Sequence, residues 1–259
     1  MTKLEEAVKD IKAGTAKLID LSQNYISAEG LKSLADALKI NKSVTAIDLS
    51  WNGIGAAGAK SLADSLKINK SITLINLSVN GIGEHGAKSL ADALKTNTSI
   101  TEMYLSLNRI GAAGAKSLAD ALQINTSITQ MDLSGNNIRD AGAKSLADAI
   151  KESKSIAHID LAENRIGTNG AQSLADSLKI NKSITEMNLS LNSEIGDAGA
   201  KSLADALKIN TSITEMNLSS FRMIGPSARE LIASFLERNR AIREKRRVMA
   251  ALLSCLSPV

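Results

Sequence analysis

The feature that most constrains this chain is a Leu-x-x-Asn motif that recurs every 28 residues. The asparagines of the motif are Asn24, Asn52, Asn80, Asn108, Asn136, Asn164 and Asn192. The leucine of the motif recurs once more, at Leu218, after a step of 29 residues. A unit this short cannot bury an apolar face alone, so such units must stack into an array with one continuous core.

Each unit has two halves with different apolar periods. In residues 99–108, Ile100, Met103 and Leu105 alternate with polar residues, which predicts a strand. In residues 111–125, alanines and leucines recur at helical spacing, which predicts a helix with one buried face. The units therefore alternate strand and helix, and the predicted fold class is α/β.

The repeated pattern resembles the leucine-rich repeat family, in its 28-residue, ribonuclease-inhibitor-like subtype. The "GAKSLADAL" half of the unit is also similar to repeats of bacterial effector proteins. The resemblance implies a right-handed horseshoe-shaped solenoid, with parallel strands on the concave face and helices on the convex face. We divide the chain into an N-terminal capping helix (1–15), eight strand units with their helices (16–225), and the last repeat helix with a C-terminal cap and basic tail (226–259). Phe221 replaces the motif asparagine in the last unit.

Composition and the chain ends limit where such a protein acts. The chain has one cysteine, Cys255, which favours a reducing compartment. Its N-terminus lacks the apolar segment of a signal peptide. We expect a cytoplasmic location, or, from the effector resemblance, non-classical secretion into a host cytosol.

A dinucleotide-binding motif is matched by Gly53-x-Gly55-x-x-Gly58, yet the repeat argues against a cofactor. The first glycine becomes Arg109, Asn137 or Arg165 in later units, which indicates a structural turn. The two histidines, His85 and His158, occupy different places in the repeat, and Asp132 beside Asp160 lacks a third ligand in the sequence. We predict no cofactor, no metal site and no catalytic residue.

The residues that differ between strand units are the candidates for binding. Strand alternation directs them to the concave surface. An apolar and aromatic patch is predicted from Trp51, Leu74, Val79, Tyr104 and Leu107. An acidic surface is predicted from Asp20, Asp48, Glu102, Asp132, Asp160, Glu163, Glu186 and Glu215, with His158 in the same columns. The sequence therefore predicts a non-enzymatic scaffold that binds a protein, basic in character or from a host, and repels nucleic acid.

Alternatives remain open at this stage. Acidic residues could equally keep an open sheet soluble. RanGAP proteins, which share the repeat length, use a loop arginine on a GTPase, and Arg109 or Arg165 could serve that role here. The basic tail, with Arg243, Lys245, Arg246 and Arg247 before an apolar run, allows a solvated cap, an acidic partner or an anionic membrane surface. We favour the cap, a monomer and no membrane partner.

Overall fold

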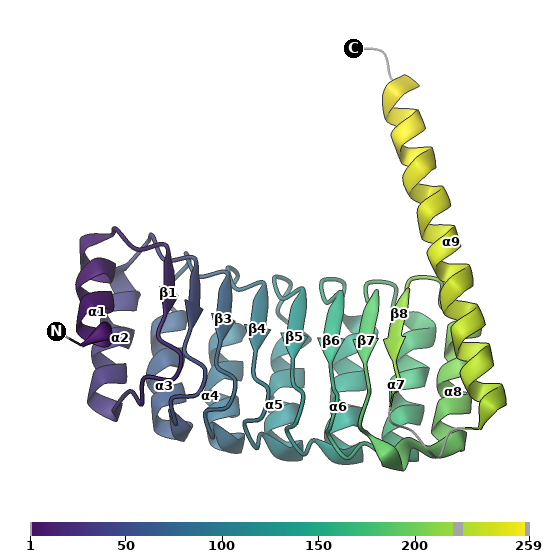
Figure 1. Ribbon diagram of the computed structural model, residues 1–259, viewed down its shortest axis with the longest axis horizontal. Coiled ribbons are helices and arrows are strands. Elements are labelled where there is room, and N and C mark those ends of the chain that lie inside the picture. Colours follow the sequence, from purple (N-terminus) through teal and green to yellow (C-terminus); the bar gives the residue numbers. More distant parts are fainter. Residues whose placement is uncertain (1, 220–224, 257–259) are drawn as a thin grey trace.

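The protein is a regular alternation of short strands and longer helices (Figure 1). The structure, a computed structural model, describes residues 2–219 and 225–256, with side chains described to residue 251. The strands are β1 (Leu18–Asp20), β2 (Ala46–Asp48), β3 (Leu74–Asn76), β4 (Glu102–Tyr104), β5 (Gln130–Asp132), β6 (His158–Asp160), β7 (Glu186–Asn188) and β8 (Glu215–Asn217). The helices are α1 (Lys3–Ala13), α2 (Ala28–Ile40), α3 (Gly55–Leu66), α4 (Gly83–Leu94), α5 (Gly111–Leu122), α6 (Arg139–Glu152), α7 (Thr168–Ile180), α8 (Gly196–Ile209) and α9 (Pro226–Leu256), with a short 3-10 helix, η1 (Ser193–Ile195). Phe221 lies outside the described residues.

Within the described residues, eight strands form one parallel sheet in sequential order. Equivalent residues of neighbouring units pair directly, so that Ile47 lies beside Ile75 and Ile75 beside Met103. The middle residue of each strand is buried, and its two neighbours face the other side of the sheet. The α/β solenoid predicted from the period is confirmed.

The core lies between the sheet and the layer of helices. Ile75 and Leu77 enter it from the strand side, and Ala87, Leu90 and Leu94 enter it from α4, all nearly or fully buried. The same positions are buried in the neighbouring units. Small alanines beside leucines let adjacent helices pack closely, which explains how a chain with 2% aromatic residues builds a continuous core.

The motif asparagines form a buried ladder along one edge of the sheet. Asn108 is fully buried, and its side-chain oxygen accepts hydrogen bonds from the backbone N–H groups of Asn80 (2.9 Å) and Ile82 (3.3 Å). Its side-chain amide donates to the carbonyl of Leu77 at 2.9 Å and to two carbonyls of its own unit. Each asparagine from Asn52 to Asn192 therefore joins two units and satisfies backbone groups that the turn removes from water.

A second asparagine ladder lies where the helices end. Asn97 accepts from the N–H groups of Ser99 and Ile100, both at 2.9 Å, and donates to the carbonyl of Leu66 at 2.7 Å. The equivalent asparagines are Asn41, Asn69, Asn125, Asn181 and Asn210. Each begins an Asn-x-Ser/Thr sequence, and burial at a turn explains these residues without glycosylation.

Backbone conformation and close helix packing explain why glycine occupies the positions of the apparent dinucleotide motif. Gly53 has a φ of 66°, and Arg109 and Arg165 occupy the equivalent place with φ values of 57° and 55°. The position therefore needs a left-handed backbone, which glycine adopts most easily. At Gly86, the third glycine of the next unit, an added Cβ would approach Ala59 Cβ to 3.0 Å, so this glycine allows close packing of α4 on α3.

Helices cover both ends of the array. At the N-terminus, Thr2 and Glu5 form a capping box that starts α1. At the C-terminus, the first part of α9 packs on α8 through Ala228, Ile232 and Leu236. The rest of α9 rises beyond the solenoid (Figure 1).

Candidate functional site

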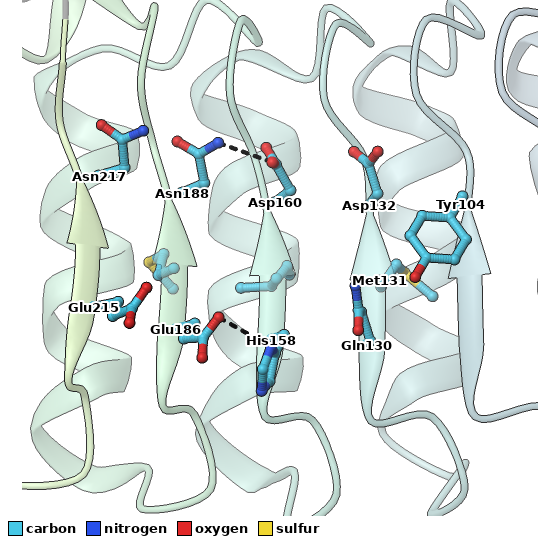
Figure 2. Close-up of a pocket in the computed structure, with 12 residues that line it drawn as sticks. Tyr104, Gln130, Met131, Asp132, His158, Asp160, Glu186, Asn188, Glu215 and Asn217 are labelled. Atoms are coloured by element: carbon cyan, nitrogen blue, oxygen red, sulfur yellow. Dashed lines mark hydrogen bonds and ion pairs between the residues drawn. The ribbon is translucent and has the colours of Figure 1, made fainter.

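The concave face contains an open hollow over β4 to β8, which we call the acidic hollow (Figure 2). Its volume is about 330 Å³. It is lined by Tyr104, Gln130, Met131, Asp132, His158, Ile159, Asp160, Glu186, Met187, Asn188, Glu215 and Asn217. The lining is built from the first and third residues of consecutive strands, with buried middle residues beneath them.

Two carboxylates lie side by side at the centre of the acidic hollow. Asp132 pairs directly with Asp160 across β5 and β6. Asp160 accepts hydrogen bonds from the backbone N–H of Ala162 and the side-chain amide of Asn188, both at 2.8 Å. Burial raises the pKa of Asp160, those two hydrogen bonds oppose the rise, and the charge of Asp132 adds to it. Unfavourable negative charge is therefore concentrated here, where a positive group would be stabilised.

Other polar side chains of the concave face are held by neighbours on the sheet. His158 Nδ1 lies 3.1 Å from Glu186 Oε2 on the next strand. The hydroxyl of Tyr104 donates to Glu102 Oε2 at 2.9 Å. Burial, the largest cause, and this hydrogen bond raise the pKa of Tyr104 to about 12. The Tyr104 ring is thereby fixed at one side of the acidic hollow, where it offers an apolar surface beside the carboxylates (Figure 2).

The structure gathers only part of the predicted site into the acidic hollow. Tyr104, Asp132, His158, Asp160, Glu186 and Glu215 line it. Asp48, Leu74 and Glu102 lie in the same strand positions but outside its lining.

The remaining predicted residues share a different backbone position. Trp51, Val79, Leu107 and Glu163 follow the strands by three residues and have φ values of 55–59°. Trp51 and Leu107 are 56% and 50% exposed. Leu107 reaches over Gly135 of the next unit, because a Cβ added there would meet the Leu107 side chain. These residues therefore border the strands from a turn, and their use in binding stays a prediction.

Sequence reasoning left out part of the acidic hollow's lining. Gln130, Asn188 and Asn217 stand in the strand columns that supplied the predicted residues, so the repeat alignment could have found them. Met131, Ile159 and Met187 belong to the buried middle column, and no sequence signal marks them as lining a surface hollow.

Two searches of the described part of the chain found nothing. No group of three or more histidine, cysteine, aspartate or glutamate side chains is placed to hold a metal ion in that part. Among the same residues, no helix has the length and apolar character needed to cross a bilayer.

Comparisons with known proteins agree with the architecture. A family model described as "Leucine Rich repeat" matches residues 41–63, 96–119, 125–147, 152–175 and 181–204. No match was found among curated proteins. Among solved structures, the leucine-rich repeat-containing protein LegL7 from Legionella pneumophila has a TM-score of 0.54 and 19% identity, over 92% of this chain and 87% of LegL7. Leiomodin-1 Actin-Binding Site 2 has a TM-score of 0.58 and 20% identity, over 63% of this chain and 95% of that structure.

The parallel sheet, the asparagine ladder and these matches define a class: a solenoid of strand–helix units that presents a continuous strand surface. The chain has the fold of the leucine-rich repeat proteins of the ribonuclease-inhibitor-like type, and the family model matches five of its repeats. Leucine-rich repeat proteins typically serve as interaction scaffolds for other proteins. The repeats of this chain therefore indicate a protein-interaction scaffold.

Proposed function

We propose that this protein is a non-enzymatic scaffold that binds a partner protein carrying basic and apolar groups through the acidic hollow. The observation that carries the proposal is the paired carboxylates of Asp132 and Asp160, in direct register and partly buried. Like charges placed opposite each other cost stability in the free protein, and a bound cationic side chain would offset that cost.

The surroundings of this carboxylate pair support a protein ligand. Glu186 and Glu215 extend the negative charge, and the Tyr104 ring adds an apolar surface. Exposed aromatic side chains beside charged ones are frequent in the centres of protein interfaces. Leiomodin-1 Actin-Binding Site 2, a structural neighbour by its fold, is named for binding a protein.

The experiment is a capture assay with the full chain as immobilised bait and candidate host lysate as the source of partners. Glu186→Lys with Glu215→Lys reverses charge within the acidic hollow, and Glu84→Lys with Asp148→Lys makes the same charge change on exposed helix positions. We expect the first double variant to lose the captured partner and the second to keep it. Capture should also weaken as salt screens the charges.

A second bait tests the aromatic residues. Trp51→Ala with Tyr104→Ala removes the apolar surface without changing net charge, and we expect it to abolish capture while circular dichroism shows a folded protein. Equal capture by the hollow variant and the outer-face control would contradict the acidic hollow as the binding site.

The setting that we propose is a bacterial protein acting in a host cytosol. The fold shared with LegL7 from Legionella pneumophila and the repeat resemblance support this setting.

The alternative of a GTPase activator stays a prediction. Arg109 and Arg165 are exposed at left-handed turn positions that glycine, asparagine or tyrosine fills in other units. Stimulated GTP hydrolysis that Arg109→Ala or Arg165→Ala abolishes would favour that alternative.

A further inference from the structure

The helix α9 has two parts with different surroundings, and they divide at Asn239. Asn239 is fully buried and donates to the carbonyls of Asn210 (2.9 Å) and Ile213 (2.8 Å), in the manner of the second asparagine ladder. Arg240 and Arg243 still reach the solenoid, through the carbonyl and hydroxyl oxygens of Thr214. The capping role of α9 therefore ends within one turn of Asn239.

Beyond that turn, residues 244–251 of the helix are exposed. Residues 240–256 extend about 25 Å at the rise of an α-helix. Lys245, Arg246 and Arg247 are exposed, and Val248 and Met249 are 49% and 59% exposed. The sequence from Val248 to Leu253 is uninterrupted by any polar residue. The cap that the sequence favoured therefore accounts for α9 only as far as Arg243, and the basic turn with the apolar segment after it calls for another role.

The edge of the solenoid from which α9 rises also combines basic residues with exposed apolar residues. This edge, at the top of Figure 1, is formed by the turns that follow the helices, and we call it the lysine–isoleucine edge. Its turns are residues 39–42, 67–70, 95–98, 123–126, 151–154, 179–182 and 208–211. In sequence these turns hold ten lysines and one acidic residue, Glu152.

The isoleucines of this edge are unusually exposed. Ile40, Ile68, Ile124, Ile180 and Ile209 occupy one repeat position and are 55–74% exposed. Thr96 and Glu152 fill the same position in other units, so the fold does not require isoleucine there. Lysines near helix ends also stabilise the helix dipole, but that effect gives no reason for exposed isoleucines beside them.

We propose that the lysine–isoleucine edge and the projecting part of α9 bind the surface of an anionic lipid bilayer. Along α9, the basic residues Lys245, Arg246 and Arg247 come before the apolar segment. In a bilayer entered from water, the charged headgroups likewise come before the acyl chains. The apolar segment is far too short to span a bilayer, and its length suits one leaflet. Lys39, Lys67, Lys95 and Lys179 form salt bridges with aspartates of their own helices. The other six lysines of the lysine–isoleucine edge add electrostatic attraction to anionic headgroups.

Acidic and basic residues lie on different surfaces of the molecule, which supports a bilayer placed against the lysine–isoleucine edge. The acidic residues Glu186 and Glu215 lie on the concave face, where a bilayer at the edge leaves them accessible (Figure 2). The proposal is therefore independent of the partner-binding function, and both surfaces could be occupied together.

The test is sedimentation of the full chain with vesicles of phosphatidylcholine alone or mixed with phosphatidylserine. We expect binding to the anionic vesicles only, reduced by added salt. Lys245→Glu, Arg246→Glu and Arg247→Glu together should weaken binding by about a hundredfold or more, on a scale of roughly fivefold for each basic residue at the surface. The matched control, Lys60→Glu with Lys88→Glu and Lys144→Glu, makes the same charge change on exposed outer helix positions and should retain most of the binding.

Two further variants separate insertion from charge attraction. A polarity-sensitive fluorophore on Met249→Cys, in a Cys255→Ser background, should shift to shorter wavelength with anionic vesicles. Ile180→Ser with Ile209→Ser should weaken binding without altering the fold, as judged by circular dichroism.

Several results would overturn the proposal. These are no binding to anionic vesicles, an equal loss in the two charge-reversed variants, or an unshifted fluorophore. A dimer by light scattering that the α9 variant dissociates, without vesicle binding, would assign the projecting helix to a second copy of the chain.

Discussion

At the scale of single residues, buried asparagines decide whether a unit can pack on the next. The side chain of Asn108 serves five backbone groups, two as acceptor and three as donor. These groups lie in a turn where the backbone has no regular partner and water cannot reach. Removing an asparagine from this position should therefore lower the free energy of unfolding by more than the net value of one hydrogen bond, because several buried backbone groups are left unpaired.

Asn108→Ala should lower the free energy of unfolding by roughly 3 kcal/mol, the scale of a few buried unsatisfied groups. Asn169→Ala, at an exposed position of α7, is the matched control and should change little. Urea denaturation followed by circular dichroism measures both. Equal, small effects of the two substitutions would show that the ladder does not stabilise the array.

Asp160→Asn should stabilise the protein at neutral pH by about 0.5 kcal/mol, because it removes a like-charge pair across neighbouring strands. The side-chain amide of the new asparagine would donate to Asp132, as Asn76 donates to Asp48 at 2.9 Å. This bond would replace the one that Asp160 accepts from Asn188.

The pH dependence of that stabilisation has a definite sign. The raised pKa of Asp160 means that the native state takes up a proton before the unfolded chain does. The native protein therefore gains stability from this group as pH falls into the window just above the ordinary pKa of an aspartate. The advantage of Asp160→Asn should shrink in that window and be largest at neutral pH. Urea denaturation at several pH values checks this, and a pH-independent difference would contradict it.

At the scale of the element, the turn between α6 and β6 lacks an asparagine of the second ladder. Ser153 stands where the other units place asparagine, and its hydroxyl accepts only long hydrogen bonds from the N–H groups of Ser155 (3.4 Å) and Ile156 (3.3 Å). The buried hydroxyl of Ser155 has no hydrogen-bond partner in the described structure. In the next unit, Asn181 makes the bonds that are missing here.

Ser153→Asn should therefore raise the free energy of unfolding by about 1 kcal/mol, the net value of the hydrogen bonds regained. The reciprocal change, Asn125→Ser, should lower it by a similar amount or more. Thermal and urea denaturation of both variants provide the measurement. A destabilising Ser153→Asn would indicate that the turn between α6 and β6 has adapted its packing to the smaller residue.

At the scale of the whole molecule, each unit contacts its neighbours only, so stability is a sum of units and interfaces. The ends are the weak points, because each has one neighbour. At the C-terminal end, the guanidinium of Arg238 donates to the carbonyls of Leu207 (2.7 Å) and Lys208 (3.1 Å) and lies over the Phe235 ring. These contacts occupy carbonyl groups that end α8.

Arg238→Ala with Asn239→Ala should increase amide hydrogen exchange in α8 and β8 by about tenfold or more while α3 to α6 keep their protection, because openings at the end of an array stay local. Arg247→Ala, an exposed position beyond the cap, is the control and should leave exchange unchanged. Uniform loss of protection along the whole chain would show that the array unfolds as a single unit.

The sequence by itself determined the repeat unit, its strand and helix halves and the column positions of the concave face, while the parallel order of the sheet was implied by the family resemblance. These are properties of a period and an alternation, which each unit expresses locally and its neighbours repeat. The tertiary structure decided which units form the acidic hollow, because the hollow extends over β4 to β8 and leaves out the same columns in the earlier units. It also placed Trp51 and Leu107 in left-handed turns and showed where the packing of α9 ends, since both depend on contacts between units that no single repeat contains.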